Sequence, residues 1–253
     1  MAGGTARILI IAGSDSGGGA GIQADIKTVT MLGGHAMTAV TAITAQNTLD
    51  VSGVHNVPTE MVIAQMDAVI DDIGVDAVKI GMIGSAQTAR AVATRLARLT
   101  VPIVLDPVMV ASSGSVLADA ATIAAFADLM RVSALVTPNL PECAALGGVE
   151  AMLPFGCQVL LKGGHGAGPV VIDRLYGTNG ARRQWEGARI ETRSTHGTGC
   201  TLASAIATGL GQGMTLEEAI ERAIAFVRAA LLAAPGLGQG HGPMGQQRVT
   251  DFR

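Results

Sequence analysis

Short apolar runs alternate with longer amphipathic segments along most of this chain. Residues 8–12 and 36–43 are rich in aliphatic and β-branched side chains, as buried strands are. Residues 21–32 and 58–73 instead repeat apolar positions at helical spacing. Strands that alternate with helices are typical of βαβ units. The pattern therefore predicts an α/β fold with a mostly parallel sheet.

The same alternation continues toward the C-terminus. Further strands are expected at residues 76–80, 103–105, 134–136 and 158–161, a small antiparallel hairpin at 170–176 and 182–190 around the turn sequence GTNG, and helices at 197–209 and 215–232. Residues 147–156 are too few for a full crossover helix, so their local structure stays open. No linker or tandem repeat divides the chain, which favours one domain over residues 1–253.

Composition narrows the possible partners. The net charge of −3 and the 2% aromatic content offer neither a basic field nor stacking surfaces for nucleic acid. The uncharged runs are broken by Gly, His, Gln and Asn, so no membrane span is expected, and the first residues do not resemble a signal peptide. Three cysteines without metal-ligand spacing fit a reducing cytoplasm.

A glycine cluster separates the first strand from the first helix. A P-loop is excluded because the dipeptide Gly-Lys occurs nowhere. Gly19, Gly21 and Ala24 match the dinucleotide pattern, but residues 38–45 lack the acid that would bind a ribose. The glycines can instead let backbone approach a small organic substrate, with Asp15, Gln23 and Asp25 nearby, or they can form a tight turn.

A second glycine motif begins the penultimate helix. Backbone amides of Gly197, Thr198, Gly199 and Cys200 can point into one anion-binding concavity at a helix N-terminus, although close packing at a helix start is the plainer interpretation. A thiol in this position is expected to have a lowered pKa, which would suit it to take a proton from an alcohol or to hold that alcohol in place. A small buried apolar role for Cys200 stays open.

Polar or flexible residues follow several predicted strands. Because ligands bind outside the carboxyl ends of parallel strands, these residues should converge on one crevice. Asp106 and Glu142 are candidates for Mg²⁺, and Lys162 for phosphate, although each can also serve a turn, a helix start or a solvated surface. The residues that follow strands are Gln46, Asn47, Gly81, Met82, Asp106, Thr137, Asn139 and Lys162.

Seven segments and a short tail resemble one known family in order. They are AGSDSGGGAGIQADIKT, TAITAQNT, KIGMIGS, VLDPVM, TPNLPE, LLKGGH, STHGTGCTLASAIA and GHGP. Together they resemble the hydroxymethylpyrimidine and phosphomethylpyrimidine kinases of thiamin synthesis, which are members of the ribokinase superfamily. Cys200 is a specific part of the match, because sugar kinases of the superfamily generally carry Asp there.

The resemblance implies a ribokinase-like domain with helices on both faces of the sheet, and a bifunctional kinase. Such enzymes use ATP and Mg²⁺ to phosphorylate 4-amino-5-hydroxymethyl-2-methylpyrimidine and then its monophosphate, and a homodimer is expected. Carried onto this chain, Gln46 and Gly13 would bind the pyrimidine and Asp25 and Met82 would line its pocket. The anion hole would be Gly197 to Cys200; Asp106, Thr137, Asn139, Glu142 and Lys162 would serve nucleotide and metal.

Three alternatives stay open from the sequence. A pyridoxal kinase of the same superfamily would phosphorylate a similar hydroxymethyl heterocycle. A non-catalytic sensor of pyrimidine or nucleotide is favoured only by the short segment at residues 148–156, where the family usually has a fuller helix. A nicotinamide oxidoreductase is disfavoured by the missing ribose acid.

Overall fold

One twisted sheet runs through the molecule. The computed structural model describes residues 4–111, 114–166 and 168–252, so the ends of the predicted domain, residues 1–3 and 253, lie outside the described residues. In the described part, nine strands form a sheet in the order β3-β2-β1-β4-β5-β6-β7-β8-β9. The strands are β1 Arg7–Asp15, β2 His35–Gln46, β3 Val51–Asn56, β4 Ala77–Ile80, β5 Ile103–Leu105, β6 Leu135–Val136, β7 Gln158–Leu161, β8 Val170–Gly177 and β9 Gly180–Ala188.

The middle of the sheet is parallel and its two ends are antiparallel. Strands β2, β1, β4, β5, β6 and β7 pair in parallel, while β3 runs against β2, β8 runs against β7, and β9 runs against β8. The predicted parallel sheet and hairpin are therefore confirmed. Strand β3 was not predicted; its burial along the strand is slight, so it lacks the apolar run that marks the central strands.

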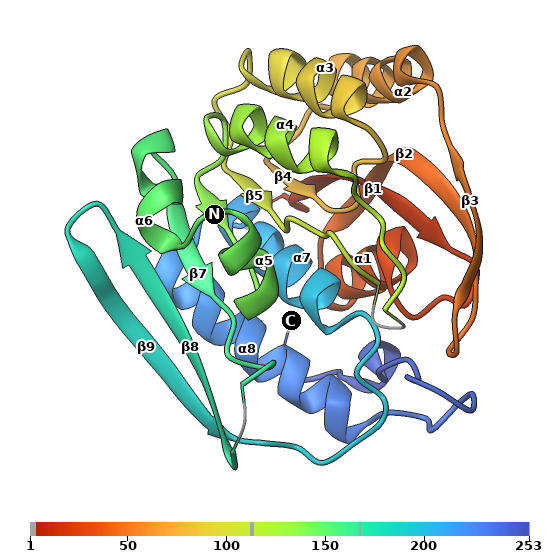
Figure 1. The fold of residues 1–253 in the computed structure, drawn as a ribbon, viewed down its shortest axis with the longest axis vertical. Helices are drawn as coiled ribbons and strands as arrows, with labels where there is room; N and C mark the ends of the chain where they lie inside the picture. Colours follow the sequence, from red (N-terminus) through yellow and green to blue (C-terminus); the bar gives the residue numbers. More distant parts are fainter. Residues whose placement is uncertain (1–3, 112–113, 167, 253) are drawn as a thin grey trace.

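Helices cover both faces of the sheet, as Figure 1 shows. Alternate residues of β1 point to opposite faces, so Leu9 and Ile11 enter one core while Ile8 and Ile10 enter the other. The first core lies under α2, α3 and α4, and the second under α1, α7 and α8. The helices are α1 Gly21–Met31, α2 Thr59–Asp72, α3 Ala86–Leu96, α4 Ala120–Met130, α5 Leu140–Ala145, α6 Val149–Met152, α7 Thr198–Gly211 and α8 Leu216–Leu232, with 3₁₀ turns at Leu153–Phe155 and Gln246–Arg248.

The short crossover whose structure stayed open contains two compact turns. Gly148 has φ 91° and begins α6, and the 3₁₀ turn Leu153–Phe155 completes the connection to β7. Met152 is fully buried and Val149 nearly so, and both pack into the core under α4. Four helical residues and one 3₁₀ turn thus bury enough apolar surface to close this face without a long helix.

The topology brings distant segments to one edge of the sheet. The carboxyl ends of β1, β4, β5, β6 and β7 lie together because these strands are parallel. The N-terminus of α7 lies against this edge, and α7 packs on β1, β4 and β5. Residues from both ends of the chain therefore meet there.

Candidate active site

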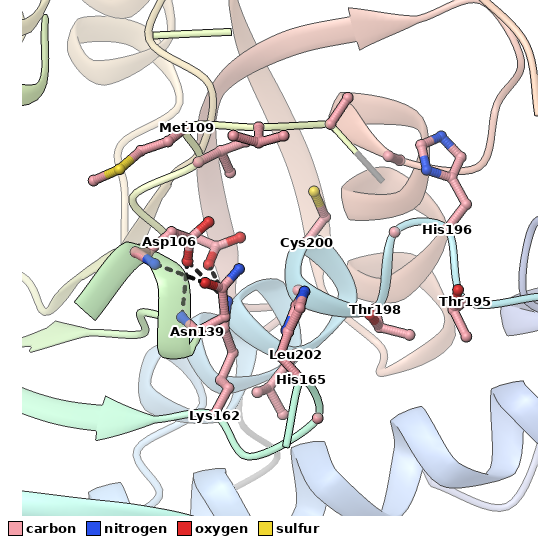
Figure 2. Close-up of a pocket in the computed structure, with 18 of the residues that line it drawn as sticks. Asp106, Met109, Asn139, Lys162, His165, Thr195, His196, Thr198, Cys200 and Leu202 are labelled. Atoms are coloured by element: carbon pink, nitrogen blue, oxygen red, sulfur yellow. Dashed lines mark hydrogen bonds and ion pairs between the residues drawn. The ribbon is translucent and has the colours of Figure 1, made fainter. Parts of the chain in front are cut away.

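A cavity of about 940 Å³ opens at the carboxyl edge of the sheet. Its volume lies near the upper end of the range of about 300–1,000 Å³ that is usual for small-molecule sites. Most residues predicted from the sequence line it: Gly13, Gln46, Met82, Asp106, Asn139, Glu142, Lys162, Gly197, Thr198, Gly199 and Cys200. Figure 2 shows Cys200 at the start of α7, with Asp106, Asn139 and Lys162 on one side and His196 on the other.

The start of α7 has the geometry of an anion site. Gly197 precedes the helix with φ 85° and ψ 9°, and a methyl group on it would collide with the carbonyl oxygen of Gly19. Only glycine fits this position. A methyl group on Gly199 would lie 3.2 Å from Nζ of Lys162 and 3.3 Å from Oδ2 of Asp106. The amide of Thr198 donates to the carbonyl oxygen of Thr195 at 3.3 Å, while the amides of Gly199 and Cys200, in the same first turn, lie beside a charged cluster.

The thiol of Cys200 is not activated in the way the helix terminus predicts. Burial, with the nearby carboxylates of Asp25 and Asp106, raises the pKa of Cys200 to about 11, although Lys79 opposes them. The expectation of a lowered pKa is wrong because desolvation and negative neighbours outweigh the helix dipole. At neutral pH this residue is a thiol, a weak hydrogen-bond donor, rather than a thiolate.

Lys162 joins two carboxylates at the ends of β5, β6 and β7. Its Nζ donates to Oδ1 of Asp106 at 2.6 Å and lies 3.9 Å from Oε2 of Glu142. Burial, reinforced by Asp106 and opposed by Lys162, raises the pKa of Glu142 to about 7. Burial works against the Lys162 ammonium, but Asp106 and Glu142 raise its pKa above the ordinary value. Lys162 is therefore cationic beside the first turn of α7.

A capping box fixes the acidic side of this cluster. Oδ1 of Asn139 accepts from the amide of Glu142 at 2.9 Å, and Oε2 of Glu142 accepts from the amide of Asn139 at 2.8 Å. The pair begins α5 and aims Glu142 at Lys162. Asn139 thus has a structural task as well as a place in the cavity wall.

Asp106 and Glu142 fit a magnesium ion that also binds phosphate. The described residues include no group of three or more His, Cys, Asp or Glu side chains placed to hold a metal. Mg²⁺ does not need such a group, since it keeps several waters and is commonly held by one or two carboxylates plus substrate phosphates. Asp106 and Glu142 would supply the two carboxylates, and a phosphate bound beside α7 would supply the remaining oxygens.

Two predicted residues do not reach the cavity. Asp25 was expected to line the pyrimidine pocket, but its side chain is fully buried, with bonds from Lys79 of 2.8 and 3.0 Å and from Ser204 of 2.7 Å. Thr137 was expected to serve the nucleotide, but it is fully buried and donates to Oδ1 of Asp106 at 3.0 Å. Asp25 and Thr137 bond to residues of the cavity wall without lining it themselves, because α1 and the end of β6 turn these two side chains into the interior.

Among the wall residues that sequence reasoning missed, Lys79 and His196 are buried polar ones. The available signal for Lys79 was a lone lysine inside the apolar strand sequence DAVKI, since a fully buried cation requires a partner. The signal for His196 was its place directly before the glycines of α7. It lies 5% exposed, 2.9 Å from Asp15.

Comparison with known proteins identifies the family. Residues 15–245 match the family model described as phosphomethylpyrimidine kinase. The chain belongs to this family. It is 47% identical over 257 residues to the hydroxymethylpyrimidine/phosphomethylpyrimidine kinase of Rhizobium meliloti, covering 95% of this chain and 96% of the relative. It is also 47% identical to the thiamine biosynthesis bifunctional protein ThiED of Geobacter sulfurreducens, of which it spans about half, 51% of the length, with 94% of this chain covered.

Solved structures of this family and of pyridoxal kinases share the fold. The chain is 34% identical to the phosphomethylpyrimidine kinase from Clostridium difficile, with a TM-score of 0.74 over 89% of this chain and 99% of that one. It is 32% identical to the pyridoxal kinase of Bacillus subtilis in an ADP complex, with a TM-score of 0.88 over 96% and 98% of the two chains. The family and the fold predicted from the sequence are confirmed. The Bacillus subtilis structure holds ADP, and a kinase of this family is likewise expected to bind a nucleotide. None of the helices described is long and apolar enough to cross a membrane.

Proposed function

We propose that this kinase transfers the γ-phosphoryl group of ATP to the hydroxyl of 4-amino-5-hydroxymethyl-2-methylpyrimidine, and then a second phosphoryl group to the monophosphate. One observation carries the proposal: a single cavity holds an anion site at α7, a charged Asp106–Lys162 pair, and the amide of Gln46. Relatives at 47% identity bear the name of this bifunctional activity.

The residues divide between acceptor and donor ends of the cavity. Gln46, with the backbone at Gly13 and the side chain of Met82, would hold the flat pyrimidine, because a primary amide both donates and accepts. Lys162 and the turn Gly197 to Cys200, chiefly through the amides of Gly199 and Cys200, would stabilise charge on the moving phosphoryl oxygens. Mg²⁺ would supply further charge neutralisation when held by Asp106 and Glu142.

Cys200 serves this chemistry as a positioning group. With a pKa of about 11, its thiol stays protonated in the working pH range. Phosphoryl transfer depends mostly on alignment and charge stabilisation, so a weak donor that orients the acceptor oxygen suffices. The alcohol step has the neutral acceptor and gains more from such orientation than the phosphate step.

An ADP-release assay with Mg²⁺ and ATP tests the function. The purified chain should release ADP with the pyrimidine alcohol and with its monophosphate. Asp106→Asn should lower kcat on the order of a hundredfold, because it disturbs the Lys162 and metal site. The exposed Asp128→Asn, which alters only surface ion pairs, should leave kcat unchanged.

Two other outcomes of that assay would point elsewhere. ADP release with pyridoxal alone would make the chain a pyridoxal kinase, a function favoured by the TM-score of 0.88 to structures of that name. Binding of the pyrimidine without any ADP release would make it a sensor.

The same proposal includes the setting of the enzyme. We place it in the reducing cytoplasm as one kinase domain, with Cys143, Cys157 and Cys200 as free thiols. A homodimer is supported by the edge strand β3 with its exposed Val54, and by the exposed apolar side chains of Ile43 and Leu49 beside that strand. Sedimentation at micromolar concentration tests the dimer; a monomer would contradict it.

A further inference from the structure

Two glycine loops from opposite ends of the chain are held together by one carboxylate. Asp15 ends β1 and accepts hydrogen bonds from the backbone amides of Gly17 at 2.8 Å, Gly19 at 3.0 Å and Ala20 at 2.8 Å. Its Oδ2 also lies 2.9 Å from Nε2 of His196, in the loop before α7. Both side chains are nearly buried, at 3% and 5% exposed. The pair therefore links the substrate loop to the anion site.

The imidazole of His196 also touches the predicted substrate-binding amide. Nε2 of His196 lies 3.3 Å from the terminal amide of Gln46. The other end of that amide lies 3.2 Å from Oγ1 of Thr44. Thr44 itself donates to the carbonyl oxygen of Ser14 at 2.9 Å. The Gln46 amide is thus held between an imidazole nitrogen and a hydroxyl oxygen.

The contact with Asp15 determines which ring nitrogen of His196 carries a proton. Burial alone would raise the pKa of Asp15, but the bond from His196 and those from the amides of Ala20 and Gly17 lower it below its ordinary value. The carboxylate is therefore ionised and can only accept. A distance of 2.9 Å between two acceptors would be repulsive, so Nε2 of His196 carries a proton and donates to Asp15.

The donors and acceptors around Gln46 then determine which end of its amide faces His196. The protonated Nε2 of His196 has no lone pair, so it cannot accept from the Gln46 amide, and its one proton points mainly at Asp15. The atom of Gln46 that can face it at 3.3 Å without repulsion is the oxygen, Oε1, as the second and longer acceptor of that shared proton. Since the Thr44 hydroxyl spends its proton on Ser14, the atom of Gln46 that faces Oγ1 must be the nitrogen, Nε2. Heavy atoms alone fit either rotation of an amide, and the hydrogen-bond network selects this one.

We propose that the Asp15–His196 pair is a specificity device, in which His196 is a positioning residue that sets the orientation of the Gln46 amide. This inference rests on the proposed function. The fixed amide keeps one N–H and one oxygen lone pair for the cavity. A 4-aminopyrimidine offers the matching pair, an amino donor next to a ring-nitrogen acceptor, whereas the phenolic oxygen of pyridoxal has a carbon-bound methyl group as its neighbour.

Gly19 makes this contact possible. A methyl group on Gly19 would collide with Cδ2 of the imidazole, and a methyl group on Gly197 would collide with the carbonyl oxygen of Gly19. The imidazole therefore packs directly on bare backbone. This explains why glycine is needed in both loops at once, for reasons other than phosphate binding.

Two substitutions of His196 separate positioning from packing. The amide nitrogen of His196→Gln can take the place of Nε2 and still donate, whereas the shorter His196→Asn cannot reach it. We expect His196→Asn to raise KM for the pyrimidine alcohol about tenfold, the cost of one hydrogen bond to a well-ordered amide. Its kcat, its KM for pyridoxal and its affinity for AMP-PCP should change less than about twofold. His196→Gln should restore most of the loss, and the exposed His35→Asn serves as the matched control.

A double-substitution cycle tests whether His196 acts through Gln46. In a Gln46→Ala background, His196→Asn should cause no further loss of selectivity between the two alcohols. Equal losses on both alcohols, a loss that persists without Gln46, or no difference between His196→Asn and His196→Gln would overturn the inference while leaving the kinase function intact. A wild-type chain that phosphorylates neither alcohol would overturn both.

A glycine substitution keeps the test decisive if His196→Asn does not fold. Gly19→Ala should push the imidazole away and reproduce the selective rise in KM. Gly53→Ala, whose new methyl group would meet only Ala45 at an ordinary 3.6 Å, is its control. Unchanged selectivity in Gly19→Ala would count against the proposal as strongly as it would in His196→Asn.

Discussion

At the scale of single residues, Cys200 shows how burial reverses a simple rule. A cysteine at a helix N-terminus normally has a lowered pKa. Here the residue lies in a confined cavity with Asp25 and Asp106 nearby, and its pKa rises to about 11. The helix terminus is local in sequence, whereas both carboxylates come from other segments of the chain. Only the fold reveals which effect is larger.

The raised pKa gives a direct prediction for Cys200. At pH 8 only about a thousandth of a thiol with this pKa is thiolate. Iodoacetamide should therefore modify Cys200 far more slowly than a free cysteine, and Cys200→Ser should keep most of the activity because a hydroxyl also donates. Cys200→Ala should slow the alcohol step far more than the phosphate step. Rapid alkylation at pH 7, measured by mass spectrometry, would contradict a protonated thiol.

The residues that sequence patterns could and could not locate differ in a physical way. Gln46, Asp106 and Lys162 follow strands, and the parallel topology alone brings strand ends to one edge. The partners of Lys79 and His196 lie 54 and 181 residues away in the chain, so no local pattern connects them. Whether a side chain lines the cavity or lies behind its wall, as Asp25 does, depends on packing.

At the scale of elements, a buried ion pair connects a strand to two helices. Lys79 on β4 binds both oxygens of Asp25 on α1, and Ser204 on α7 donates to the same carboxylate. Burial raises the pKa of Asp25, yet three hydrogen bonds favour the ionised pair. Burial opposes the Lys79 ammonium, but the carboxylates of Asp25 and Asp106 raise its pKa. The pair thus ties the middle of α7 to α1 and to the sheet.

Breaking this pair should destabilise the whole fold. Lys79→Met leaves the Asp25 carboxylate buried without its cation, and we expect a loss of about 3–5 kcal/mol in the free energy of unfolding. Urea denaturation followed by circular dichroism measures it. Arg131→Met removes an exposed ion pair with Asp128 and should cost less than about 1 kcal/mol. A Lys79→Met loss as small as that of Arg131→Met would mean that Asp25 takes up a proton and needs no partner.

Element prediction succeeded where a strand is a buried apolar run or a helix shows a clear apolar period. Residues 103–105 and 158–161 are strands with the predicted bounds, and the predicted helix at 58–73 extends over Thr59–Asp72. β3 escaped because an edge strand exposed on both faces carries no alternation, and its place is set by pairing with β2. The compact turns of α6 were equally invisible, since four residues are too few to show a period.

At the scale of the whole molecule, one sheet serves two cores. Each central strand contributes alternate residues to both faces, so neither core can be lost without exposing the other. The sequence predicted a parallel sheet, but the strand order depends on non-local pairing that no run of residues encodes. The order in turn determines that β1 lies between β2 and β4, inside the sheet, where its end can meet α7.

The hairpin β8–β9 lies at one end of the sheet, so its unfolding shows whether the whole molecule unfolds as one unit. It is tied to α8 by ion pairs of Arg182 with Glu217 and Arg183 with Glu221, and Trp185 packs against the core under α8. Trp185 is the only tryptophan of the chain, so its fluorescence reports on this hairpin alone.

We expect the fluorescence of Trp185 and the far-ultraviolet circular dichroism to follow one unfolding transition in urea. The apolar contacts of Trp185 with the α8 side of the core should outweigh the exposed ion pairs of the hairpin, which contribute little. AMP-PCP should shift both curves to higher urea by the same amount, because a ligand that binds only the native state stabilises every part that unfolds with it. A fluorescence change at lower urea than the loss of helix signal would show that the hairpin unfolds separately, and would divide the chain into two cooperative units.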